Sequence, residues 1–229
     1  MYVSPADPRT TEEFPPFRRL GGASTGWDRV LVRLFDIMIA AALLIFLAPL
    51  LLLVAALVYI VDPGPIFFAH RRLGQDGRSF PCLKFRSMVV DAEQRLNRLL
   101  VTSAEAREEW ARDFKLKHDP RITRIGHFLR KSSIDELPQL INVLRGEMSL
   151  VGPRPIVEKE IARYGRYYAH YSAVKPGLTG LWQVSGRNSV SYRRRVALDV
   201  SYARNKSLGL DLRILVMTVP AVLLAKGSC

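Results

Sequence analysis

An uninterrupted apolar stretch, residues 37–61, is the strongest pattern in the chain, and it contains no charged side chain. A helix needs about 20 apolar residues to cross a bilayer, so this stretch is long enough to do so. A buried core helix is the alternative, but helices inside soluble domains rarely run this long without a charge. Pro49 follows Ala48 in the middle of the stretch. A proline there kinks or breaks a helix, because it removes a backbone donor and clashes with the preceding turn.

Basic residues flank this stretch on both sides: Arg18, Arg19, Arg29 and Arg33 precede it, and Arg71, Arg72, Arg78, Lys84 and Arg86 follow it. Basic residues beside a membrane segment favour the cytoplasmic side. A helix that is broken at Ala48 and Pro49 and leaves by the face it entered satisfies both flanks, whereas a straight span places one flank outside. We therefore favour re-entry, although spanning helices also tolerate proline.

The rest of the chain contains shorter predicted helices and strands. Pro63-Gly64-Pro65 ends the apolar helix, and two runs rich in β-forming residues then flank Gln75-Asp76-Gly77, which indicates a hairpin. The later patterns predict helices over 91–117, after Asp119-Pro120, over 137–144, near 157–171 and over 191–205, with a glycine-rich connection at 175–188. The last uncharged segment, 214–225, is short for a span and contains Pro220, so we expect an interfacial or core helix there.

These patterns together predict an α+β fold that is mainly helical. We expect a mobile N-terminal tail over 1–26, a membrane helix over 27–62, and a domain over 63–229 that carries the small β-hairpin and the interfacial helices.

The net positive charge of the chain indicates which classes of partner it can bind. The chain has 229 residues, a formal charge of +13 and a pI of about 10.2, so it should attract polyanions such as nucleic acid, anionic lipid or phosphorylated small molecules. Arg193-Arg194-Arg195 would suit nucleic acid, but a free nucleic-acid binder has no use for a long apolar anchor, so we expect none. Cys82 and Cys229 show no metal-ligand or disulfide spacing, which indicates a reducing, cytosol-facing location, with Cys82 buried as a small hydrophobic residue.

Two adjacent carboxylates, Asp135 and Glu136, stand in the stretch SSIDELPQL. A structural interpretation places Asp135 at the N-cap of the helix that contains Pro138, with Glu136 in its first turn or in a capping box with Ser133. A functional interpretation uses one carboxylate to attack phosphorus and the other to hold a magnesium ion. Arginine and lysine must then screen the phosphate charge; the candidates are Lys84, Arg86, Arg124, Arg130 and Arg154.

Several longer motifs are recognisable: FDIMIAAALLIFLAPLLL, HRRLGQDGRSFPCLKFRSM, DPRITRIGHFLRKSSIDELPQLINVLRGEMSLVGPRP and KPGLTGLWQVSGRN. They resemble the bacterial sugar transferase family, the monotopic phosphoglycosyl transferases that act on undecaprenyl phosphate. The resemblance runs from about Trp27 to the C-terminus, and DELPQL followed by MSLVGPRP is its most specific part. It is nearest to the exopolysaccharide initiators that transfer galactose 1-phosphate or glucose 1-phosphate.

The resemblance implies a re-entrant helix broken at Pro49, on the cytoplasmic face of the bacterial inner membrane. It implies transfer of a sugar 1-phosphate from a UDP-sugar to undecaprenyl phosphate with release of UMP. Asp135 matches the nucleophile that forms a covalent phosphosugar intermediate, and Glu136 matches the Mg²⁺ ligand. The substrate-binding candidates are Lys84, Arg130 and Arg154 at basic positions of the family's site, Arg86 beside them, and Gln183 and Arg187 for nucleotide or sugar recognition.

A non-catalytic membrane-bound interaction protein with a basic, polyanion-binding surface is the alternative. Such a protein would use the apolar helix and membrane lipids in the same way, but it has no need for the Asp135-Glu136 pair. The sequence identifies neither the transferred sugar nor the oligomeric state, a homo-oligomer included.

Overall fold

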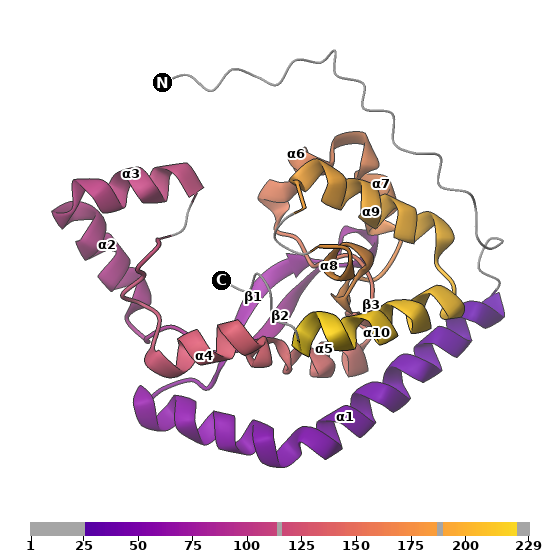
Figure 1. Cartoon of the computed structure of the whole chain (residues 1–229), viewed down its shortest axis with the longest axis horizontal. Helices are drawn as coiled ribbons and strands as arrows, with labels where there is room; N and C mark the ends of the chain where they lie inside the picture. The colour runs from indigo at the N-terminus through magenta and orange to yellow at the C-terminus, as the bar shows by residue number, and fades with distance from the viewer. Residues whose placement is uncertain (1–25, 114–115, 187–189, 224–229) are drawn as a thin grey trace.

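The computed structural model describes residues 26–223 apart from 114–115 and 187–189 (Figure 1). The long helices are α1 (Gly26–Val61), α2 (Ala92–Thr102), α3 (Ala104–Asp113), α9 (Tyr192–Asn205) and α10 (Leu208–Leu223). The shorter helices are α4 (Arg124–Ser132), α5 (Gln139–Arg145), α6 (Ile161–Tyr164), α7 (Tyr168–Ser172) and α8 (Leu181–Val184). Single turns of 3₁₀ helix are η1 (Gln75–Gly77), η2 (Ile134–Glu136), η3 (Glu158–Glu160) and η4 (Gly165–Tyr167). The strands are β1 (Phe67–Leu73), β2 (Ser79–Phe85), β3 (Ser149–Val151) and β4 (Gly177–Thr179). The expectation of a mainly helical α+β fold is confirmed for the described residues.

Helix α1 lies along one side of the rest of the protein and bends in its middle (Figure 1). Pro49 lies inside this helix, and proline is a common cause of such a bend because it removes one hydrogen bond and crowds the preceding turn. The arm that follows the bend packs Val54 and Val58 against Leu129 of α4, while Ala40 of the first arm belongs to the main core. The sequence therefore located this helix correctly, and α1 shares a core with the body it supports.

Polar contacts fix the first arm of α1 to the body of the protein. In the first arm, Arg33 donates to the carbonyls of Val143 and Leu144 at the end of α5, at 2.6 and 2.9 Å. Asp36, only 4% exposed, accepts from the Ser149 hydroxyl at 2.8 Å and from the Leu150 amide at 3.0 Å. These contacts satisfy free helix-end carbonyls and the first residues of β3, so they lock the helix direction.

The predicted hairpin is confirmed. Strands β1 and β2 pair antiparallel around η1, where Asp76 (φ 56°) and Gly77 (φ 71°) adopt the left-handed backbone that the turn requires. The register sets Phe68 opposite Lys84 and Arg72 opposite Phe80. Residues opposite each other in an antiparallel pair share a face, so the register places Arg72, Cys82 and Lys84 on one face of the hairpin.

A second, parallel pair joins β3 to β4, and the sequence patterns did not predict it. The motif around Gly177 had indicated only a glycine-rich connection. Glycine is required there because a Cβ on Gly177 would clash with the backbone of Gly152. This close approach brings the 152–155 loop beside the start of α8.

Two predicted helices are divided. The 91–117 segment forms α2 and α3 with a break at Ser103, and the 157–171 segment forms η3, α6, η4 and α7. Gly165, at φ +50°, interrupts the second of these. The basic helix expected over 191–205 is confirmed as α9, and Cys82 is buried as expected, at 3% exposed. Phe114, Arg187 and Cys229 lie outside the described residues.

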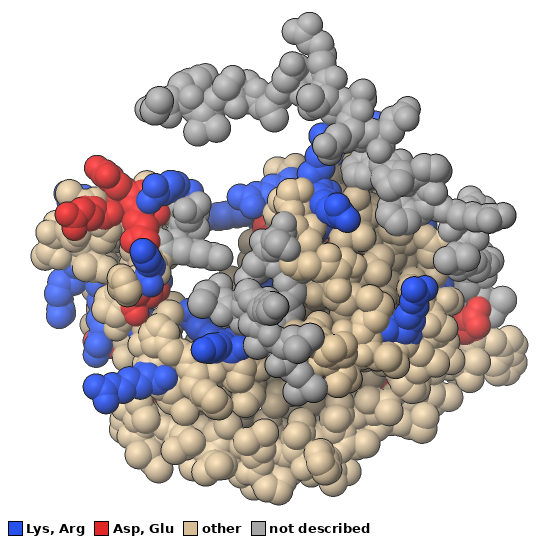
Figure 2. Space-filling model, viewed as in Figure 1, with Lys and Arg blue, Asp and Glu red and all other residues tan. Residues whose placement is uncertain are grey.

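The outer face of α1 is apolar and exposed. Only 11% of its most apolar 18-residue window is buried within the protein, and among the described residues it is the helix long and apolar enough to cross a membrane. Side chains such as Ile45, Phe46, Leu52 and Ile60 are each more than 70% exposed. Figure 2 shows an uncharged surface where α1 runs, with Lys and Arg side chains above it. An exposed apolar face of this length indicates association with a membrane.

Candidate active site

The Asp135-Glu136 pair forms a single 3₁₀ turn, η2, between α4 and α5. Ser133 ends α4 in the left-handed conformation (φ 60°), and the Leu137 amide bonds the Ile134 carbonyl. Neither acid is an N-cap: η2 and α5 have no side-chain cap hydrogen bond, and the capping box expected between Ser133 and Glu136 does not form. The purely structural interpretation of the pair is therefore wrong in its details, because the chain uses a turn where a longer helix was expected.

Lys84 of β2 contacts both acids. Its Nζ lies 2.6 Å from Glu136 Oε1 and 3.8 Å from Asp135 Oδ2. Arg154, from the loop after β3, places Nη2 3.7 Å from the same oxygen of Glu136. The fold thus brings together four of the residues singled out in the sequence, although they come from three separate segments.

The two carboxyls have opposite electrostatic environments. Burial raises the pKa of Asp135, which is 7% exposed, and the charge of Glu136 raises it further, against the opposing effect of Lys84. Burial also acts to raise the pKa of Glu136, but Arg154 and Lys84 outweigh it and the pKa is lowered. Asp135 is therefore the more basic carboxylate, whereas Glu136 is held ionised.

Arg130 of α4 also interacts electrostatically with Asp135. Its Nε donates to the Ser87 hydroxyl at 2.9 Å. Burial lowers the pKa of Arg130, and the charge of Asp135 is the largest opposing influence. The Arg130 guanidinium, held by the Ser87 hydroxyl, can stabilise negative charge near Asp135.

A small pocket opens beside Glu136. Its lining residues come from both hairpin strands, α5, the 152–155 loop and the β4–α8 segment: Arg72, Cys82, Lys84, Glu136, Gln139, Arg154, Pro155, Gly177, Leu178 and Gln183. The sequence analysis missed Arg72 and Gln139 as lining residues. Arg72 could have been found from the hairpin register, since it shares a face with Lys84, whereas nothing in the sequence pointed to Gln139.

Gln183 does line the pocket. Its Nε2 donates to the Leu178 carbonyl at 3.3 Å, and its buried Oε1 has no partner among the described residues. An unpartnered buried acceptor in a pocket is suited to a ligand donor.

Arg86 is not brought to the carboxylates. Its guanidinium donates to the Asp62 carbonyl and lies 3.3 Å from the Asp62 carboxylate, so it fixes the end of α1. Its assignment to substrate binding stays a prediction, as does that of Arg187, which lies outside the described residues.

Magnesium is compatible with this arrangement. The described residues contain no group of three or more metal-ligating side chains, but two adjacent carboxylates suit Mg²⁺, which is commonly held by one or two carboxylates together with substrate phosphates and water. The Lys84 ammonium lies 2.6 Å from Glu136 and 3.8 Å from Asp135, so both acids face a common position.

Comparison with known proteins agrees with the motifs. The model of the family described as "Bacterial sugar transferase" matches residues 27–225. A "UDP-galactose-lipid carrier transferase" of Erwinia amylovora is 54% identical over 88% of this chain and 42% of its own length. An "Undecaprenyl-phosphate galactose phosphotransferase" of Salmonella typhimurium is 51% identical over the same shares. The "Exopolysaccharide production protein ExoY" of Sinorhizobium fredii is 49% identical over 95% of this chain and 93% of its own length.

The chain therefore spans less than half of the longer relatives and nearly all of the shorter one. Because the family match covers most of the sequence, the chain belongs to the bacterial sugar transferase family.

Proposed function

We propose that the protein transfers a sugar 1-phosphate from a UDP-sugar to undecaprenyl phosphate, releasing UMP and forming undecaprenyl-diphosphate-sugar. The printed names of the relatives support this reaction, since they include undecaprenyl-phosphate galactose and glucose phosphotransferases. The observation that carries the proposal is the pair of adjacent carboxylates in unlike environments, Asp135 buried and Glu136 paired with Lys84 and Arg154.

In the first step, an Asp135 carboxylate oxygen attacks the β-phosphorus of the donor. A new O–P bond forms while the bond from the β-phosphorus to the bridging oxygen breaks, and UMP leaves with that oxygen and its electron pair. The product on the enzyme is an acyl phosphate that carries the sugar. Burial favours this attack, because a buried carboxylate with a raised pKa is a stronger nucleophile.

In the second step, a phosphate oxygen of undecaprenyl phosphate attacks the same phosphorus. The bond to Asp135 breaks, and the carboxylate is regenerated with its electron pair. A covalent intermediate lets the soluble donor and the lipid acceptor bind one after the other.

Both steps bring anions together, so positive charge must offset the repulsion. Lys84 and Arg154 contact Glu136, and Arg130 interacts with Asp135, so three cations lie near the two acids and can offset this repulsion. Magnesium bound by Glu136 and by donor phosphate oxygens would neutralise the charge that develops on the diphosphate.

We further propose that α1 re-enters the membrane at the cytoplasmic face of the bacterial inner membrane. Arg33 and Asp36 tie its first arm to the body, and Asp62 at its far end is tied to Arg86. A straight span would separate these two attachments by the width of a bilayer, which is about 30 Å of hydrocarbon. Anchoring of both arms on one body favours a shallow wedge that keeps the site at the lipid surface.

Release of UMP tests the function directly. Purified protein in lipid should release UMP from UDP-galactose or UDP-glucose when undecaprenyl phosphate and Mg²⁺ are present, and a panel of UDP-sugars identifies the sugar. Asp135→Asn keeps the size of the side chain but removes the nucleophile, so the rate should fall by about a thousand-fold or more. A release rate unchanged by Asp135→Asn would contradict the assignment.

A further inference from the structure

Arg72 stands at the pocket without a role in the reaction described above. Three lining side chains are cationic, Arg72, Lys84 and Arg154, and one is anionic, Glu136. The lining therefore has a positive excess, which suits a ligand with more than one negative charge. Of the three cations, Lys84 and Arg154 both contact Glu136, whereas Arg72 has different partners.

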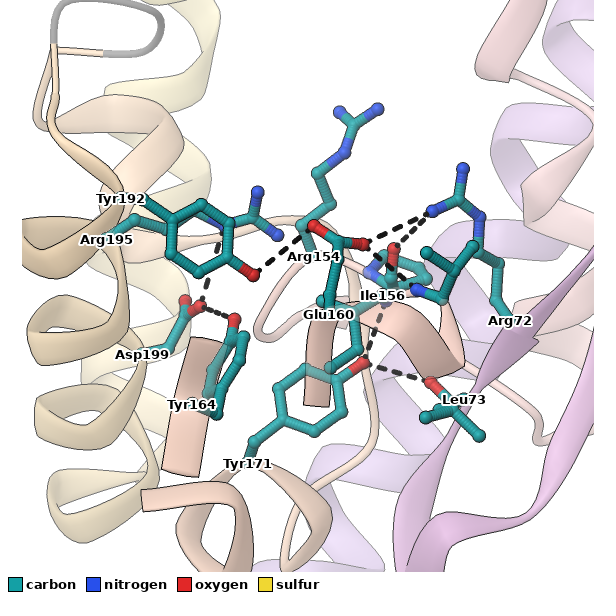
Figure 3. Close-up of polar contacts among 12 residues, drawn as sticks. Arg72, Leu73, Arg154, Ile156, Glu160, Tyr164, Tyr171, Tyr192, Arg195 and Asp199 are labelled. Carbon is teal, nitrogen blue, oxygen red and sulfur yellow. Dashed lines mark hydrogen bonds and ion pairs between the residues drawn. The ribbon is translucent and has the colours of Figure 1, made fainter. Parts of the chain in front are cut away.

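One nitrogen of Arg72 makes both of its polar contacts within the described part of the chain. Nη1 donates to the Pro155 carbonyl at 3.4 Å and lies 3.8 Å from Glu160 Oε2 (Figure 3). The Nε and Nη2 groups form the other edge of the guanidinium. Two parallel N–H groups on one edge match the geometry of two phosphate oxygens.

A second arginine lies close to the first. Burial lowers the pKa of Arg72, and the charge of Arg154 lowers it further. In Figure 3 the side chains of Arg72 and Arg154 extend toward the same side of the 154–160 segment. Two guanidinium groups of like charge beside one pocket repel each other until an anion lies between them.

Glu160 holds Arg72 in place. Its Oε2 accepts from the Val157 amide at 3.0 Å, and its Oε1 accepts from the Tyr192 hydroxyl at 3.3 Å. Tyr192 is itself fixed in α9, because the guanidinium groups of Arg163 and Arg195 lie over its ring at 4.9 and 5.3 Å. Glu160 therefore connects β1, the 155–160 segment and α9, and it orients Arg72 from behind the pocket.

We propose that Arg72 binds a phosphate group of the donor diphosphate through its Nε–Nη2 edge, and that Glu160 is the positioning residue that keeps this edge turned to the pocket. The inference rests on the proposed function, because it assigns the donor diphosphate as the ligand. It adds a residue from β1 to a site otherwise built from β2, η2 and the 152–155 loop.

Arg72→Gln tests the binding role, and Arg71→Gln is its matched control, since Arg71 is the exposed neighbour on the opposite face of β1. For Arg72→Gln we expect the KM for the UDP-sugar to rise about tenfold or more, which is the loss of one charge-assisted contact. Arg72→Lys should restore only part of this, because an ammonium lacks the two-pronged edge. Arg71→Gln should leave KM unchanged.

Glu160→Gln tests the positioning role. The amide keeps an acceptor for Tyr192 but loses the charge that attracts Arg72, so we expect KM to rise about threefold to tenfold with kcat unchanged. Tyr192→Phe, which removes only the hydrogen bond to Glu160, should give a smaller rise. A residue that merely stabilises the fold would lower the melting temperature and kcat without this selective change in KM.

Binding of UDP to protein that carries Asp135→Asn separates this inference from the proposed function, because no transfer is needed for the signal. Suppose that protein with an intact Asp135 turns over no UDP-sugar, but that Arg72→Gln weakens UDP binding by about tenfold in the Asp135→Asn background. The proposed reaction then fails and the Arg72 assignment stands. If turnover is normal and Arg72→Gln changes neither KM nor UDP binding, the Arg72 assignment is overturned and the reaction stands. Absence of both turnover and UDP binding in otherwise unaltered protein would overturn both.

Discussion

The ammonium of Lys84 lies 2.6 Å from Glu136 Oε1, and this contact joins β2 to η2 across 52 residues of sequence. The same ammonium lies 3.8 Å from Asp135. Lys84 therefore lowers the pKa of both acids, in opposition to burial. It also sets the distance between the hairpin and the turn that carries the acids.

Replacing Lys84 should make both acids harder to ionise. In Lys84→Met the pKa of Asp135 rises, because burial is no longer opposed by the charge of Lys84, so a larger fraction of Asp135 is protonated at any given pH. The acid limb of the pH–rate profile for UMP release should move to higher pH, and the rate at neutral pH should fall by about tenfold or more. Lys131→Met, at an exposed position of α4, is the control. An acid limb that stays in place would show that Lys84 does not tune Asp135.

Magnesium should be required, with Glu136 setting its affinity. Chelation should abolish UMP release, and added Mg²⁺ should restore it. In Glu136→Gln the Mg²⁺ concentration for half-maximal rate should rise by about tenfold or more, because the amide is a neutral and weaker ligand. Full activity in the presence of a chelator would remove the metal from the reaction.

The topology of α1 gives a third prediction. In a Cys229→Ser background, where Cys82 is buried, a cysteine introduced as Ser4→Cys should react with a membrane-impermeant thiol reagent only after the cells are permeabilised. Glu158→Cys, on the exposed surface of the body, should behave identically. Reaction of Ser4→Cys in intact cells would mean that α1 spans the membrane.

A buried acid in α9 should make stability depend on pH. Burial raises the pKa of Asp199 to about 7, although Tyr164 donates to it at 2.7 Å and Arg195 lies 3.9 Å away (Figure 3). A raised carboxyl pKa means that the folded state binds the proton more tightly than the unfolded state. The stabilisation is therefore complete below about pH 4 and is lost as pH rises through 7.

Melting temperatures from pH 5 to pH 8 measure this effect. The fall in melting temperature between pH 5 and pH 8 should be smaller in Asp199→Asn than in the unaltered protein. It should not vanish, because Asp211 has a pKa raised by burial to about 6 and acts in the same direction. Equal slopes in the two proteins would show that Asp199 does not titrate in this range.

Much of the architecture followed from local patterns. The apolar run predicts α1, the two β-rich runs predict the hairpin, and the sequence identifies the two acids, Lys84 and Arg154 as candidates that the fold brings together. These features depend on hydrophobic periodicity, turn residues and charge, all of which can be read within a single segment of the sequence. Gly165 is a local signal for the division of the 157–171 helix, since glycine readily adopts the positive φ found there.

Long-range pairing could not be predicted in the same way. Pairing of β3 with β4 depends on the close approach of Gly152 and Gly177, and Arg86 turns to Asp62 because the end of α1 lies beside it. Neither contact can be predicted from the residues of one segment alone, because each depends on which distant segment lies beside it. Arg72 could have been predicted in part, because the hairpin register alone places it on the same face as Lys84.

The most direct measurement is rapid chemical quenching of the protein with a UDP-sugar labelled in its sugar, without lipid acceptor. We expect labelled phosphosugar to be trapped on the polypeptide at Asp135, UMP to be released in equal amount, and undecaprenyl phosphate then to remove the label. Asp135→Asn should trap none. Release of UMP with no label on the protein, or equal label on Asp135→Asn, would contradict this expectation.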